Sequence, residues 1–203
     1  MLFQPIIDSN DFPRAVMDLA APMMRDFGLP RPGQLGLVVP DVEAAARDLE
    51  KQGIGPFFIA EGPVFRWTER GGDRTFSGKL GLARHRGLDL ELLEPGTGSD
   101  FYGRALDPEG RIVLHHLGFF IKSVEPWEER IRGKGVDTWV RGSIRKGPVV
   151  AEFAYMDSVA THGLVCELID QRFFGFPAAA PPAFLLHGAG FLQKALGRRS
   201  IKT

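Results

Sequence analysis

The sequence predicts an α+β fold made of two successive βαβββ modules. The first observation behind this prediction is an imperfect repeat, in which "QLGLVVPDVEAA" (34–45) is matched by "HLGFFIKSVEPW" (116–127). The second is that the two copies also end alike, with "GLDLELLE" (87–94) matched by "GLVCELID" (163–170). A repeat of this length indicates that one unit of strands and a helix occurs twice in the chain.

Each copy begins with an apolar strand that leads into a helix and then a glycine stop. Asp41 in the first copy and Ser123 in the second stand where a helix N-cap belongs, so their side chains can accept hydrogen bonds from the first turn. Gly53 and Gly135 suit the left-handed position that follows a helix. The sequence therefore predicts one helix directly after the first strand of each copy.

Two regions, 56–86 and 138–162, connect the helix of each copy to its last strand. Both alternate β-type residues with glycine, proline and charged turn clusters, which suits about three strands in each region. The segment "EPGTGSDFYGRALDPEGRI" (94–112) then joins the two copies as a linker. Because repeated units of this kind usually bury a shared core, we expect one domain rather than two.

The repeat leaves one segment outside it at each end of the chain. The N-terminal segment contains a predicted helix from about residue 13 to residue 27, followed by the break "GLPRPG". The C-terminal segment joins a proline-rich turn to a short amphipathic helix, which we expect to pack within the protein or its homodimer. The predicted organisation is an N-terminal helical extension (1–32), a paired-module domain (33–171, with modules at about 33–95 and 114–171) and a C-terminal extension (172–203).

Composition narrows the classes of function. The chain has 203 residues and is 44% hydrophobic, which is enough for a core. Its 25 basic residues balance 25 acidic ones, so no bulk charge indicates nucleic acid or an anionic membrane as a partner. The single Cys166 excludes an internal disulfide and a cysteine-based zinc site. Without a signal peptide or a run of roughly 18 apolar residues, we expect a cytoplasmic protein that acts on small molecules.

Four polar residues share one register of the repeat. Side chains alternate between the two faces of a strand, so Gln34 lies on the face opposite Leu35 and the other oily residues that pack on the helix. The same alternation places Glu91, His116 and Glu167 at equivalent strand positions, all on the face away from the helices. Two carboxylates inside a concave sheet would cost several kcal/mol unless a cation or protons compensated them. A single His or Gln is usually structural or solvated, but the matched positions favour a divalent metal site.

These residues lie in motifs that resemble the vicinal oxygen chelate superfamily, which includes glyoxalase I, methylmalonyl-CoA epimerase, extradiol dioxygenases and bleomycin-resistance proteins. The motifs are "QLGLVVPD", "LELLEPG", "HHLGFF" and "LVCELID", and the similarity covers about residues 33–171. With "GIGPFFIAE", the chain looks most like the epimerase-type branch. The resemblance implies a cup-shaped, incompletely closed β-barrel that holds one metal ion. Carried onto this sequence, the implied ligands are Gln34, Glu91, His116 and Glu167.

The donor types limit the choice of metal. Oxygen-rich ligation with a single imidazole suits Zn²⁺, Mn²⁺, Co²⁺, Ni²⁺ or Mg²⁺ and does not choose among them. It speaks against a dioxygenase, because non-haem iron oxygen chemistry uses two histidines and one carboxylate. Only His116 falls in register, and the neighbouring His115 should point to the opposite face of the strand.

The resemblance implies a metal-dependent isomerase or epimerase that removes a proton next to a carbonyl through a metal-stabilised enolate. The glyoxalase pattern gives Glu167 the role of base, and Glu61 lies near the place where epimerases have a second acid/base. Epimerases more often have His where Gln34 stands and Gln where Glu91 stands, so the carbonyl or thioester substrate stays open. The alternatives are a metal-free small-molecule-binding protein of the bleomycin-resistance type, or a metal-dependent ring-opening, addition or dioxygenase enzyme.

Overall fold

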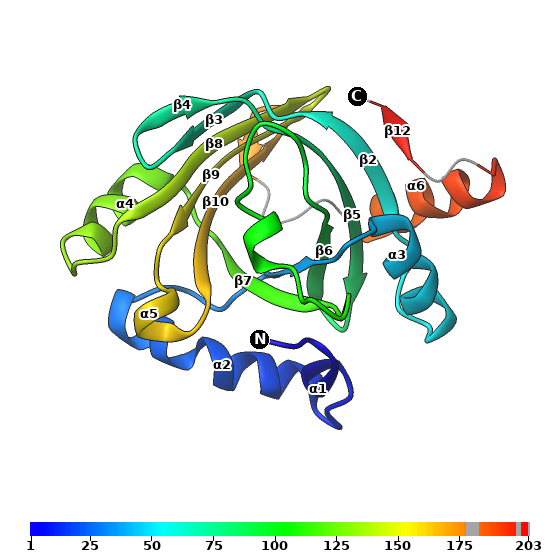
Figure 1. Cartoon of the computed structure of the whole chain (residues 1–203), viewed down its shortest axis with the longest axis horizontal. Helices are drawn as coiled ribbons and strands as arrows, with labels where there is room; N and C mark the ends of the chain where they lie inside the picture. The colour runs from blue at the N-terminus through cyan, green and yellow to red at the C-terminus, as the bar shows by residue number, and fades with distance from the viewer. Residues whose placement is uncertain (178–182, 198–199, 203) are drawn as a thin grey trace.

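The structure is a computed structural model that describes residues 1–177, 183–197 and 200–202. These residues form one curled twelve-stranded sheet with helices on its outer side (Figure 1). The strands are β1 (Gln34–Val38), β2 (Phe58–Pro63), β3 (Arg66–Glu69), β4 (Gly72–Arg74), β5 (Ser77–His85), β6 (Leu88–Leu93), β7 (Val113–Phe120), β8 (Thr138–Lys146), β9 (Val149–Met156), β10 (Val165–Phe173), β11 (Phe176–Pro177) and β12 (Ile201–Lys202). The helices are α1 (Gln4–Ile7), α2 (Phe12–Phe27), α3 (Val42–Lys51), the short 3₁₀ turn η1 (Gly103–Ala105), α4 (Val124–Arg132), α5 (Val159–His162) and α6 (Ala183–Ala195).

The strand order shows the two modules side by side. It runs β12-β2-β5-β6-β1-β7-β10-β9-β8-β3-β4, with β11 attached to β10. Each module pairs its first strand in parallel with its last, β1 with β6 and β7 with β10, and the modules meet where β1 and β7 run antiparallel. Within the described residues the two ends of the sheet, β12 and β4, do not pair, so the barrel stays open. The predicted α+β cup of two βαβββ modules is confirmed.

The predicted number of strands between the helices and the last strands is wrong. The first connecting region contains four strands, β2 to β5, and the second contains only β8 and β9. The difference arises because β3 and β4 leave their own module and add to the second one, where Arg66 lies opposite Ser143 and Glu69 opposite Val140. The hairpin thereby covers the edge of β8, which would otherwise expose unpaired backbone groups.

The predicted helix ends are largely confirmed. The Asp41 side chain accepts a hydrogen bond from the backbone N–H of Ala44 at 2.9 Å and so caps α3. Ser123 occupies the N-cap position of α4, but its side chain makes no capping hydrogen bond. Gly53 and Gly135 have φ values of 80° and 83°, the left-handed conformation that a Cβ atom disfavours.

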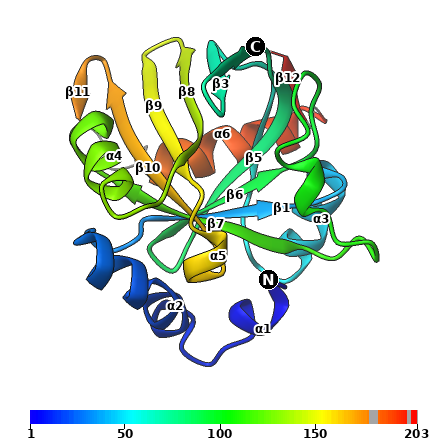
Figure 2. The ribbon, with the colours of Figure 1, turned by 60° about the vertical axis from the view of Figure 1, so that its left-hand side comes forward.

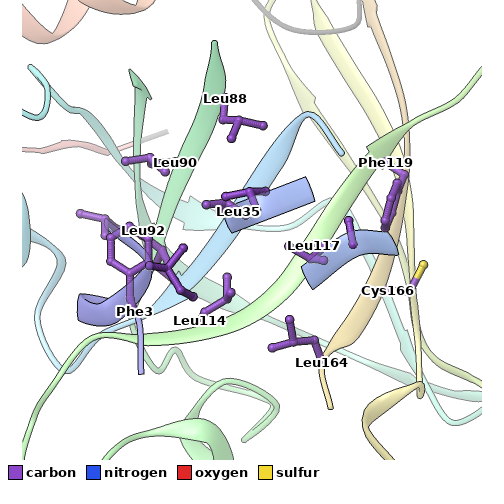
Figure 3. Close-up of a cluster of buried hydrophobic side chains, with 14 of the residues drawn as sticks. Phe3, Leu35, Leu88, Leu90, Leu92, Leu114, Leu117, Phe119, Leu164 and Cys166 are labelled. Atoms are coloured by element: carbon purple, nitrogen blue, oxygen red, sulfur yellow. The ribbon is translucent and has the colours of Figure 1, made fainter. Parts of the chain in front are cut away.

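Buried apolar side chains cover both faces of the sheet. The main core lies on the outer side, where Leu35 and Leu117 pack beneath the helices (Figure 3). A second cluster includes Val38, which lies on the other face of β1, and two aromatic residues of the linker, Phe101 and Tyr102. The linker therefore fills part of the cup with aromatic rings, and the remaining inner space is where a site can form.

The C-terminal segment covers the outer edge of β2. The amide of Gln193 on α6 accepts from the backbone N–H of Ile59 at 2.8 Å and donates to its carbonyl oxygen at 2.7 Å, so it replaces a neighbouring strand. β12 pairs with the same edge, with Ile201 opposite Ala60. Among the described residues, no helix has the length and apolar content that a membrane crossing would require.

Candidate metal centre

Three of the four predicted ligand residues meet at one point inside the cup. One ligand atom from each of Glu91 on β6, His116 on β7 and Glu167 on β10 lies within 4.8 Å of the others. The Nε2 atom of His116 is 3.1 Å from Oε2 of Glu167 and 3.6 Å from Oε2 of Glu91. Three strands from both modules thus contribute to one cluster, because each module places its first and last strands next to the junction.

Gln34 flanks this cluster from β1. It is buried, and in the sheet it lies directly opposite Gly118. A Cβ atom on Gly118 would lie 2.9 Å from Cβ of Gln34 and 3.3 Å from Oε2 of Glu167, so both side chains border the space that this glycine leaves. Gln34 therefore borders the same space as the three candidate ligands that the structure brings together.

The glycines of the repeated motif make this convergence possible. Gly36 lies opposite His116, and a Cβ atom at Gly36 would overlap the imidazole ring. In the same way, a Cβ atom at Gly118 would crowd the side chain of Gln34, because it would lie 2.9 Å from Cβ of Gln34. Each copy of the motif therefore has a glycine where the first-strand polar residue of the other copy needs room, and this accounts for a glycine two residues into each strand.

The electrostatics of the cluster favour a bound cation. Burial opposes a charge on His116, but the neighbouring Glu167 and Glu91 carboxylates outweigh it and raise the pKa of His116 to about 9. Burial raises the pKa of Glu91, and the charge of Glu167 adds to that shift while His116 opposes it. Within the described residues, His116 Nε2 and Glu167 Oε2 are buried without a hydrogen-bond partner. This nitrogen and this carboxylate oxygen, with the Glu91 carboxylate beside them, are suitable donors for a divalent ion, so the residues fit a metal.

The prediction that His115 points to the helix side is wrong. The β1–β7 register shifts after Gly36, so that Gly36 lies opposite His116 and Leu37 opposite Leu114, and His115 is the extra residue of a β-bulge. The His115 ring lies 5.0 Å from the ring of Phe101 inside the cup, with Nδ1 3.1 Å from Nδ1 of His116. The doublet "HH" is visible in the sequence, but the bulge depends on the partner strand and has no sequence signal of its own.

A hydrogen bond between His115 and His116 orients the His116 ring. Burial lowers the pKa of His115 well below its ordinary value, so the ring is neutral and its Nδ1 can accept the Nδ1–H of His116. That hydrogen bond turns the Nε2 atom of His116 toward the two carboxylates. Histidines that bind metals commonly donate their other ring N–H in this way, which fixes the tautomer and the orientation of the ring.

We expect His115→Phe to weaken metal binding by about 10- to 100-fold, because the aromatic packing is kept while the hydrogen bond to His116 is lost. Competition with a chromophoric chelator measures the affinity. The matched control is His162→Phe, since His162 lies on α5 against Phe27 and Asp26. Equal metal affinity in the two variants would contradict a role for His115 in orienting His116.

Glu61 stands apart from the three convergent candidate ligands. It lies opposite Lys79 in the β2–β5 register and shares a strand face with Ile59, which packs in the main core. Glu61 nevertheless borders the inner cavity at its β2 wall. Among the described residues, the group of convergent ligand atoms contains Glu91, His116 and Glu167 and does not include it.

A cavity of 360 Å³ opens on the cluster from within the cup. Gln34, Glu91 and Glu167 all border it. Most of its other walls are apolar side chains from several strands, among them Phe58, Leu80, Leu82, Phe120, Ile144 and Ile169. An apolar cavity with a few convergent polar groups is the usual form of a small-molecule site.

Comparison with known proteins yields structural similarities alone. No family model and no curated protein matches the chain. A variant of methylmalonyl-CoA epimerase from Streptomyces coelicolor is 21% identical, with a TM-score of 0.45 over 70% of this chain and 94% of that one. The epimerase from Mycobacterium tuberculosis is 14% identical, with a TM-score of 0.44 over 68% and 85% of the chains. A variant of 4-hydroxymandelate synthase from Streptomyces coelicolor is 14% identical, with a TM-score of 0.49 over 82% and 56% of the chains.

Proposed function

We propose that this protein is a metal-dependent isomerase or epimerase that removes a proton from the carbon next to a carbonyl group. The observation that carries the proposal is the convergence of Glu91, His116 and Glu167, with buried unpaired atoms, beside an apolar cavity. We assign Gln34 as the fourth ligand. When bound, one divalent ion would supply positive charge that stabilises negative charge on the substrate oxygen.

Glu167 is the proposed base. Its Oε2 atom is buried and, within the described residues, has no hydrogen-bond partner, and Glu167 borders the cavity. With His116 Nε2, which lies 3.1 Å from this oxygen, holding a metal ion in place of the imidazole proton, the oxygen is able to take a proton from a carbon held beside it. We assign Glu61, which borders the cavity on β2, as the second acid/base that an epimerase needs to deliver a proton to the other face of the carbon.

Elemental analysis of gently purified protein tests the proposal. We expect about one divalent ion per chain, lost in Gln34→Ala and Glu91→Ala variants, because a buried metal needs most of its ligands. Absence of metal, even after reloading with each of Zn²⁺, Mn²⁺, Co²⁺, Ni²⁺ and Mg²⁺, would instead support the metal-free binding protein. Solvent-deuterium exchange next to a carbonyl, without ring opening or oxygen uptake, separates the isomerase from the ring-opening, addition and dioxygenase alternatives.

Metal binding should depend on pH. The pKa of His116 is raised to about 9, so below that pH a metal ion must displace a proton from the ring. We expect the affinity to rise with pH, by about tenfold per unit below the pKa of His116, and one proton to be released per ion bound. Calorimetric titrations in buffers with different ionisation enthalpies measure both quantities. An affinity that stays constant from pH 6.5 to pH 8.5, with no proton release, would contradict His116 as a ligand.

A further inference from the structure

The inner cavity is elongated along β10. Glu167, Ile169, Gln171 and Phe173 alternate on the inner face of that strand, and all four border the cavity. The first and the last are six positions apart, and a strand advances about 3.3 Å per residue, so the cavity wall extends about 20 Å along β10 from Glu167. A ligand that filled it would have to be long rather than compact.

The walls between the two ends are mostly apolar, although the Gln171 amide also borders the cavity there. On neighbouring strands, Ile144 lies opposite Ala151, and Ala151 lies opposite Gln171. Across the cup, Leu80 and Leu82 of β5 line the same cavity. The middle of a bound molecule would therefore be mainly hydrocarbon, because Gln171 offers one amide there and most of the other neighbouring side chains are apolar.

A cation lies at the end of the cavity far from the cluster. Lys146, the last residue of β8, is opposite Val149, which is in turn opposite Phe173 at the end of β10. Figure 2 shows β8, β9 and β10 side by side, so these residues form one row. Lys146 is half-buried and borders the cavity.

Lys146 differs from the other cavity lysine in its partners. Lys79 forms ion pairs with Glu43 at 3.3 Å and with Glu94 at 3.8 Å. The side chain of Lys146 has no ion pair or hydrogen bond within the part of the chain that the structure describes. A half-buried lysine that borders the cavity and has no partner among the described residues can pair with an anion supplied by a ligand.

We infer that the site takes an elongated amphipathic molecule with an apolar body and an anionic end group, a carboxylate or a phosphate ester, which pairs with Lys146. The opposite end of the molecule carries the carbonyl group and lies at Glu91, His116 and Glu167. Only this second assignment rests on the proposed function. The anionic end group and the apolar body follow from Lys146 and the cavity walls alone.

Calorimetry on chelator-treated protein with decanoate, decyl phosphate and decanol as probes tests the inference without metal. We expect the wild type to bind at least one of the two anions about fivefold more tightly than decanol, as one partly exposed ion pair contributes about 1 kcal/mol. Lys146→Met should remove this preference and leave decanol binding unchanged. The matched control is Arg145→Met, because Arg145 is the adjacent β8 residue and its side chain lies 4.3 Å from the Phe65 ring.

Three results would overturn the inference: no binding of any probe, equal binding of anions and decanol, or the same loss in both variants. Preference for decanoate identifies a carboxylate end group, and preference for decyl phosphate identifies a phosphate ester. Elemental analysis of the same preparations before chelation separates the two proposals. Protein without a metal site that keeps the anion preference contradicts the proposed reaction, whereas a metal site without the preference contradicts the role of Lys146.

Discussion

Glu167→Gln is expected to lower the rate of proton exchange next to the substrate carbonyl by about 10³-fold. The variant removes the proton acceptor but keeps an amide oxygen at the same place, so the metal should stay bound. NMR in deuterated water follows the exchange on the carbonyl compound or thioester that the wild-type protein labels. Elemental analysis of the same sample establishes that the metal is present.

Asp170→Asn is the matched control for this experiment. Asp170 lies on the same strand, three residues further on, and so faces the other side of the sheet, where it pairs with Arg172 at 3.0 Å. Like Glu167→Gln, the Asp170→Asn substitution replaces a largely buried carboxylate by an amide. We expect the exchange rate of this variant to stay near the wild-type value. A Glu167→Gln protein with bound metal and a normal rate would show that another group takes the proton.

Gly36→Ala is expected to abolish metal binding and to lower the free energy of unfolding by about 1–3 kcal/mol. The new methyl group would overlap the imidazole ring of His116, which is fully buried. The ring must turn away or β1 must separate from β7, and either change moves Nε2 away from the carboxylates. Elemental analysis and urea denaturation measure the two effects.

Gly72→Ala is the appropriate control for the glycine substitution. Gly72 is an exposed strand residue on β4, and its added Cβ would lie at an ordinary distance of 3.5 Å from the Glu69 carbonyl oxygen. We expect this variant to bind metal as the wild type does. A Gly36→Ala protein that holds one metal ion with wild-type affinity would mean that His116 is not a ligand.

The inner and outer faces of the repeated strands could be predicted from the sequence because alternation is a local property of a strand. Leu35 and Leu117 pack in the main core, and Glu91, His116 and Glu167 meet on the other face. The repeat also identified which strands of the two modules correspond, since matched segments occupy matched positions in paired modules.

Other features depended on contacts between segments far apart in the chain. The β3–β4 hairpin pairs with β8 of the second module because that edge is open. The sequence of the hairpin does not indicate with which strand it pairs. The Gln193 amide hydrogen-bonds the backbone of Ile59 because the edge of β2 is open there, and the sequence does not indicate this contact either.

What the sequence by itself determined is the two-module α+β fold and the register of four polar residues, because strand alternation and helix caps act over a few residues. The tertiary structure alone decided that His115 turns inward and that Lys146 shares a cavity with Glu167. A bulge exists only between two paired strands, and a cavity only where several strands enclose it, so neither can be seen in one segment of the chain.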